Sequence, residues 1–116
     1  MKELKVVNKR NSMFIGNVRI ANKFTTRLKG LLGSSPLSSF QGLLIKPCKQ
    51  VHTIGMRYSI SIWYVDQKLR IVRIIDDLEP FKISPYVGDS HLIIEFPSKW
   101  AEITGSQEGD LLDVYI

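Results

Sequence analysis

Short apolar segments separated by turn-forming residues are the feature that most limits how this chain can fold. Each segment is rich in valine, isoleucine or aromatic side chains, a composition typical of β-strands. Gly, Pro, Asn, Asp and Ser cluster between the segments, as they do in turns. Seven strands are therefore predicted, at residues 4–7, 13–20, 42–45, 60–65, 69–75, 91–96 and 111–116.

Two short helices are predicted beside these strands. Leucines at spacing i, i+3 and i+4 indicate a helix over 27–32. A second helical turn is expected to begin at Pro97–Ser98 and to end at Gly105. Many strands with one or two short helices predict a mainly β fold, a small single-domain β-barrel or β-sandwich.

A long connection is predicted between the fifth and sixth strands. It covers 76–88 and contains Pro80 and Pro85, which restrict its backbone. Phe81 and Tyr86 also lie in it, and we expect their aromatic side chains to fix it against the domain.

The length of 116 residues and the hydrophobic content of 44% predict one domain over residues 1–116. A chain of this size buries roughly two thirds of its surface on folding, so it needs no disulfide or structural metal. Cys48 is the single cysteine, which excludes an intramolecular disulfide and a site of four thiolates.

No segment of the sequence has the length of a membrane-spanning helix. Such a helix needs about 18 consecutive apolar residues, and the longest run, 60–65, is interrupted by Ser61. The first twenty residues carry five Lys or Arg and only short apolar runs, which argues against a signal peptide. We therefore expect a cytoplasmic protein without a membrane span that is still able to dock on a membrane complex.

The net charge of +5 at pH 7 describes a basic protein. Its Lys and Arg residues are scattered among the predicted strands and turns, and no nucleic-acid motif is present. Trp63, Tyr64, Phe96 and Trp100 are candidate base-stacking residues, but Trp63 and Tyr64 are consecutive in a strand and must face opposite sides. No specific nucleic-acid binding is expected.

Four pieces of the sequence have the composition and order of a known family. They are the segments 27–33, 47–57 and 60–66 and the pair Gly109–Asp110, and the second contains Pro-Cys, Val-His-Thr and Met-Arg in that order. Together they resemble the family catalogued as domain of unknown function 192. The resemblance runs from about residue 25 to the C-terminus.

The resemblance implies a compact, mainly β domain with no assigned reaction. Relatives with the His-Thr motif occur near genes for pilus assembly and secretion, which implies partners of that kind. Ser59 and Ser61 stand where the family usually has Pro and Asp before the aromatic strand. Any chemistry that this Asp performs in relatives would be absent here.

The segment around His52 holds the best candidate binding residues. Arg57 can hold a carboxylate or phosphate of a small anionic ligand, His52 can orient the ligand and Thr53 can donate a hydrogen bond. We expect His52 and Arg57 to lie close together near a concave surface at the end of the sheet. In the structural alternative, Arg57 pairs with Asp66 or Glu95, and Thr53 tethers a turn.

Cys48, His52 and Met56 suggest a second kind of site. They stand at i, i+4 and i+8 and carry the ligand types of a soft metal such as copper. A blue-copper site would also need a second imidazole, which only His91 can supply. A Cys48 thiol activated by His52 is the corresponding enzyme hypothesis. In the structural alternative, Cys48 and Met56 are apolar core side chains.

The sequence thus favours a non-enzymatic binding or accessory domain, without a cofactor or metal, that serves a pilus or secretion assembly. It would act through a pocket or patch around His52 and Arg57, and the full set of predicted ligand-binding residues is His52, Thr53, Arg57, Cys48 and Met56. The alternative is a small enzyme or soft-metal-binding protein that uses Cys48, His52 and Met56.

The scattered charge predicts that any binding to nucleic acid is weak and independent of base sequence, because Lys and Arg then contact phosphates only. A salt titration of DNA and RNA binding measures this. Tight, sequence-selective binding that survives about 200 mM salt would contradict the prediction.

Overall fold

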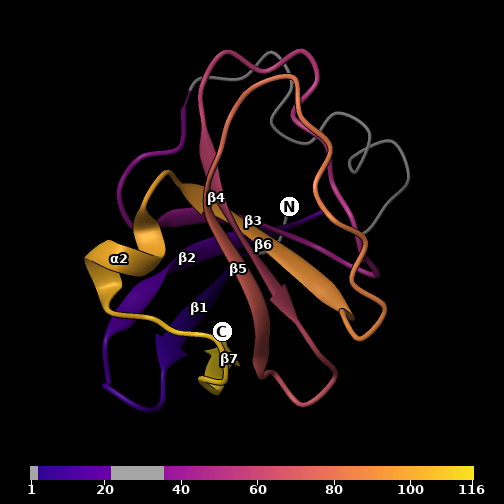
Figure 1. Cartoon of the computed structure of the whole chain (residues 1–116). Helices are drawn as coiled ribbons and strands as arrows, with labels where there is room; N and C mark the ends of the chain where they lie inside the picture. Colours follow the sequence, from indigo (N-terminus) through magenta and orange to yellow (C-terminus); the bar gives the residue numbers. More distant parts are fainter. Residues whose placement is uncertain (1–2, 22–35) are drawn as a thin grey trace.

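Seven strands form one sheet in the computed structural model, which describes residues 3–21 and 36–116. The sheet order is β5-β4-β6-β3-β2-β1-β7, and the sheet curls into a half-barrel (Figure 1). The strands are β1 (Glu3–Asn8), β2 (Phe14–Ala21), β3 (Gln41–Ile45), β4 (Ile60–Val65), β5 (Ile71–Leu78), β6 (Leu92–Pro97) and β7 (Leu112–Tyr115). The predicted mainly β class is confirmed.

One short helix, α2 (Trp100–Thr104), is present within the described ranges, and Gly105 ends it as predicted, in a left-handed conformation. The helix begins at Trp100 instead of at Pro97–Ser98, because β6 extends to Pro97. The helix predicted over 27–32 lies outside the described residues. No helix in the described part of the chain is both long and apolar enough to cross a membrane.

Strand pairing closes the curled sheet at one end. Neighbouring strands are antiparallel except β2 and β3, which run parallel. The Leu112 amide donates to the Leu69 carbonyl at 2.8 Å, and Arg70 forms a β-bridge with Leu111. These contacts join the residues just before β5 to the start of β7, so the two edge strands of the sheet meet there.

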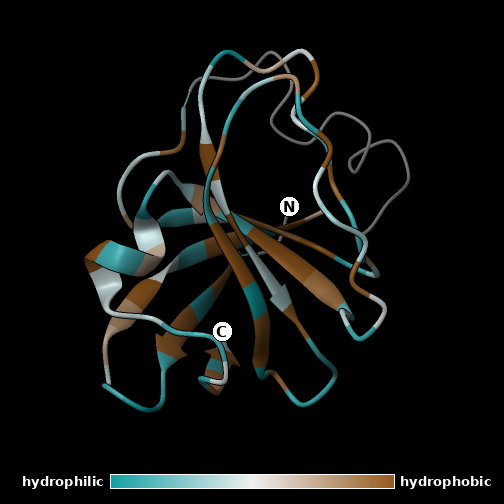
Figure 2. Cartoon of the chain, viewed as in Figure 1, coloured by the Kyte–Doolittle hydropathy of each residue, from teal (hydrophilic) through white to brown (hydrophobic). Residues whose placement is uncertain are grey.

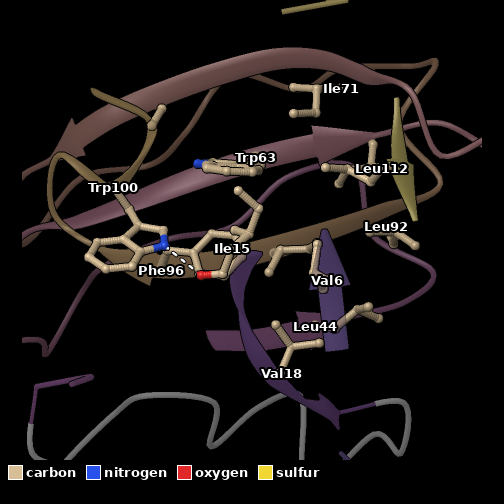
Figure 3. Close-up of a cluster of buried hydrophobic side chains, with 13 residues drawn as sticks. Val6, Ile15, Val18, Leu44, Trp63, Ile71, Leu92, Phe96, Trp100 and Leu112 are labelled. Carbon is tan, nitrogen blue, oxygen red and sulfur yellow. Dashed lines mark hydrogen bonds between the residues drawn. The ribbon is translucent and has the colours of Figure 1, made fainter. Parts of the chain in front are cut away.

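The concave side of the sheet holds the larger core. Alternate residues of the central strands point into it, including Trp63, Ile94 and Leu44, which are cross-strand neighbours. Figure 3 shows this inner cluster, in which the Trp100 indole N–H donates to the Ile15 carbonyl at 2.9 Å. Burial of these side chains favours the curl, because it removes their apolar surface from water.

The other face of the central strands is also buried. Tyr64 and Ile93 are cross-strand neighbours in this outer cluster, and both are fully buried. The cluster comprises Ala21, Leu43, Ile45, Cys48, Met56, Ile60, Ile62, Tyr64, Leu78 and Ile93. Trp63 and Tyr64 therefore face opposite sides as predicted, and both belong to the core.

A series of hydrogen bonds through polar side chains attaches α2 to the sheet. The Trp63 indole N–H donates to the Ser61 hydroxyl at 2.9 Å, and that hydroxyl donates to the Asp76 carboxylate at 2.6 Å. Asp76 also accepts from the backbone amides of Ala101 and Glu102. A carboxylate from β5 thus caps the helix, whose own N-cap residue provides no side-chain hydrogen bond.

We expect Asp76→Ala to lower the free energy of unfolding by about 2 kcal/mol, because it leaves two helix amides and the Ser61 hydroxyl without their acceptor. Urea unfolding measures the change. The matched control is Asp77→Ala, since Asp77 is exposed and accepts only from Ser98 among the described residues. Equal losses from the two variants would contradict the capping role.

Candidate functional site

Two loops far apart in the sequence pair to form a ribbon at one end of the domain. Residues 46–59 follow β3, residues 79–91 follow β5, and Figure 1 shows them side by side at the top of the view. The Thr53 amide donates to the Lys82 carbonyl at 2.8 Å, and the Ser84 amide donates to the Val51 carbonyl at 2.9 Å. His52 and Ile83 form the antiparallel bridge between these two bonds.

The alternation of side chains divides this ribbon into two sides. Thr53 and Ser84 are buried on the inner side, at 0% and 2% exposure. The other side carries His52, Ile54, Phe81 and Ile83, which we call the outer ribbon face. All four side chains of this face are exposed, at 48% for Ile54, 68% for Phe81 and 66% for Ile83.

The expectation that aromatic side chains fix the 76–88 connection is wrong. Phe81 and Tyr86 are 68% and 66% exposed. Hydroxyl groups on the inner side fix the loop instead: Thr53 accepts from the Lys82 amide and donates to the Glu79 carbonyl, while Ser84 accepts from the Val51 amide. Part of the predicted connection is also strand, because β5 extends to Leu78.

His52 and Arg57 are both exposed side chains of the first loop. The Nδ1 atom of His52 accepts a hydrogen bond from the Ile54 amide at 3.2 Å, which leaves Nε2 pointing away from that turn. Within residues 3–21 and 36–116, the single ion pair joins Arg10 and Asp110. Arg57 therefore forms no pair with Asp66 or Glu95, and its charge faces solvent.

Thr53, Cys48 and Met56 lie on the inner side of the same loop. Cys48 and Met56 are part of the outer cluster, and the Cys48 thiol donates to the Gln50 carbonyl at 3.3 Å. The Thr53 hydroxyl is engaged with the second loop. The structure thus separates the five predicted site residues into an exposed pair, His52 and Arg57, and a buried set.

The Tyr64 hydroxyl reaches the underside of the ribbon. It donates to the Pro85 carbonyl at 2.7 Å. Burial raises the pKa of Tyr64, while the hydrogen bond with Ser84 and the charge of Arg73 act in the opposite direction. This contact ties the ribbon to the central strand β4, and it supports the outer ribbon face from below.

Glu95 is a buried acid that the sequence did not identify as a site residue. It lies between Leu43 and Ile62 in the sheet and is 4% exposed. No hydrogen bond or ion pair to its carboxylate is formed by the part of the chain that the structure describes. Burial raises the pKa of Glu95 from 4.5 to about 7.

Asp110, from the last of the four family pieces, anchors the opposite end of the domain. Burial alone would raise its pKa, but hydrogen bonds from Arg10, Asn8 and the Gln107 amide outweigh that effect and lower it. These bonds join the turn after β1 to the residues before β7. Asp110 therefore has a structural role.

The position where the family usually has Asp is also structural in this chain. Ser61 is fully buried within β4, and its hydroxyl bonds to Trp63 and Asp76. The carboxylate at this point of the fold comes from β5 instead of from residue 61.

The comparisons with known proteins agree with the fold. The family model described as DUF192, "Uncharacterized ACR", matches residues 5–114. No curated protein matches the chain. A protein of unknown function from Novosphingobium aromaticivorans DSM 12444 has a similar structure, with a TM-score of 0.78 and 17% identity over 96% of this chain and 83% of that one.

A second similar structure is that of a "putative transcription regulator" from Sinorhizobium meliloti 1021. Its TM-score is 0.80 and its identity 12%, over 97% of this chain and 92% of that one. At these identities, both structures support the fold alone.

The raised pKa of Glu95 predicts that stability falls as pH rises from about 4.5 to 7, because the unfolded chain releases this proton while the folded protein retains it. Glu95→Gln should remove this dependence. The variant should match the parent protein at pH 4 and exceed it by about 3 kcal/mol at pH 8. Urea unfolding at several pH values measures both.

The exposed Glu79→Gln is the control and should leave the pH profile unchanged. If Glu95→Gln is less stable than the parent at pH 8, the ionised carboxylate is stabilised in the folded protein and the prediction is wrong.

Proposed function

The chain belongs to the DUF192 family of uncharacterised proteins, and we propose that it is a non-enzymatic binding or accessory domain. The contact surface is the outer ribbon face together with Arg57. The single observation that carries the proposal is that a well-bonded ribbon holds large apolar side chains in solvent, and that its first loop also carries Arg57, an exposed cation without a carboxylate partner in the described ranges.

The exposed apolar side chains support a binding role because the ribbon has a buried side, and its large apolar residues are not on it. Ser and Thr occupy the inner side of the ribbon, whereas Phe81 and Ile83 occupy the outer side. An isolated exposed isoleucine has no special meaning, but adjacent exposed apolar residues are typical of interaction surfaces. Burial against a partner would remove this apolar surface from water.

Two exposed polar side chains of the first loop support recognition of an anionic group. The Arg57 guanidinium can bind a carboxylate or phosphate with two hydrogen bonds. His52 can add a third donor from Nε2, since its Nδ1 is already an acceptor in the turn. The ligand-binding role proposed from the sequence thus applies to His52 and Arg57, while Thr53, Cys48 and Met56 support the loop from within.

The resemblance to relatives encoded near pilus and secretion genes supports a protein assembly of that kind as the setting. The proposal retains the cytoplasmic location expected from the sequence. Affinity capture from the native cell, followed by identification of the bound proteins, tests both points. Recovery of pilus or secretion components would support the proposal.

We expect Arg57→Ala to leave the melting temperature within about 1 °C of the parent value, because the side chain is exposed and forms no ion pair with the described residues. The same variant should lose most of the captured partner. Arg19→Ala is the matched control, since Arg19 is an exposed cation on β2.

A drop of several degrees with Arg57→Ala would show a structural role for the guanidinium. Unchanged capture by a folded Arg57→Ala variant would show that the partner binds elsewhere. Either result would contradict the proposed contact surface.

A further inference from the structure

Glu95 is an acidic side chain in an otherwise apolar strand. Figure 2 shows β6 mainly in the brown of hydrophobic residues. Ile94 belongs to the inner cluster, so the next residue, Glu95, points to the opposite face of the sheet, which carries the outer cluster. Its cross-strand neighbours there are Leu43 on β3 and Ile62 on β4, and both belong to the outer cluster. The Glu95 side chain therefore stands between two apolar neighbours.

Two cations on the same face do not pair with this carboxylate. Arg19 on β2 is in register with Leu43, and Arg73 on β5 is in register with Tyr64, so each lies two strands away from β6. Two strand spacings are about 10 Å. Both arginine side chains are exposed, and neither forms an ion pair with residues 3–21 or 36–116. Glu95 therefore has no counter-ion in these ranges.

The Glu95 carboxylate is buried but is not sealed from solvent. The residue is 4% exposed, and its oxygens have no hydrogen-bond partner among the described residues. In the same part of the chain, every side-chain nitrogen or oxygen that is fully enclosed has a hydrogen-bond partner. The Glu95 oxygens have none, so they must reach a small opening in the outer face of the sheet.

An unpaired acid at this position lowers the stability of the folded protein above neutral pH. Burial raises the pKa of Glu95 to about 7, so at higher pH the buried carboxylate is charged. Buried charges in proteins are normally paired or bound to a metal ion. A cation that enters from outside would supply the partner that the described chain does not.

The donor set favours an organic cation over a metal ion. Ca²⁺ and Mg²⁺ take about six or more oxygen ligands, and the described residues contain no group of three His, Cys, Asp or Glu side chains that could hold a metal. A primary ammonium group can be held by a single carboxylate. The alkyl chain behind the ammonium group can contact Leu43 and Ile62, as the stem of a lysine does on apolar surfaces.

We infer that Glu95 and its apolar neighbours form a binding site for a primary alkylammonium group, with the nitrogen on the carboxylate and the alkyl chain against Leu43 and Ile62. The same chemistry occurs in a free alkylamine and in a lysine side chain of a partner protein. The inference goes beyond the proposed function and does not depend on it, because the outer ribbon face is a different surface and its proposed ligand is an anion.

Thermal unfolding at pH 8 in the presence of hexylammonium chloride tests the inference. Most Glu95 is ionised at this pH, so binding to the folded protein should raise the melting temperature as the amine concentration rises. At about ten times the dissociation constant, the rise should be about 5 °C. Hexanol has the same alkyl chain without the charge and should give no comparable rise.

Variants at two glutamates connect the effect with the site. Glu95→Gln keeps the shape of the side chain and removes its charge, so it should lose the rise caused by hexylammonium. Glu79→Gln removes an exposed acid and should respond as the parent does. Circular dichroism verifies that both variants are folded. No rise in the parent protein, or equal rises in the parent and in Glu95→Gln, would overturn the inference.

Carbon-13 NMR of the Glu95 carboxyl group gives a second measurement that needs no variant. Hexylammonium should lower the pKa of Glu95, because a bound cation favours the ionised form. An unchanged pKa at saturating amine would contradict the inference. A blocked alanyl-lysyl-alanine peptide separates the two sources of the ligand: the same pKa change with this peptide indicates a lysine side chain, and a change with the free amine alone indicates a small molecule.

Discussion

Burial of the central strand on both faces is the constraint on which the rest of this structure depends. Every residue of β4 is buried, with Trp63 in the inner cluster and Tyr64 in the outer one. The curl of the sheet covers the inner face, because strands from both ends contribute to that core. The outer face needs cover from outside the sheet, and the loop after β3 contributes Cys48 and Met56 to it. The position of the candidate site therefore follows from the need to cover β4.

A loop that covers a core must also provide hydrogen-bond partners for its own backbone N–H and C=O groups. The two loops do so by pairing with one another. Thr53 and Ser84 replace backbone groups as acceptors at points where the ribbon is irregular. Their burial forces the alternate residues, His52 and Ile83, outward. The exposed face is thus a geometric consequence of the ribbon, whereas its residue types are not, since the side chains at positions 54, 81 and 83 belong to neither core cluster.

The local sequence pattern was sufficient to predict the strands. The features that it did not predict depend on pairing between segments that are far apart in the sequence. Strand-forming composition bounded by turn residues located all seven strands to within about three residues at each end, and Gly105 marked the end of α2. The ribbon joins residues about thirty apart in the sequence, so nothing local shows that Phe81 faces solvent. Glu95 was missed for a related reason: an acid in an apolar strand normally faces water, and only the sheet order shows that Leu43 and Ile62 flank it.

The residues of the family motif in 47–57 form two groups, one buried and structural and the other exposed. Cys48, Thr53 and Met56 are buried, and each has a packing or hydrogen-bonding role that explains its side chain. His52 and Arg57 come from the same eleven-residue stretch but are exposed, and among the described residues only the turn contact of His52 gives either of them a role in folding. On a recognition surface, exposed residues that the fold does not require are held in place by buried residues that the fold does require. The loop has this arrangement. The buried half of the motif therefore explains the loop, and the exposed half indicates where a partner would touch it.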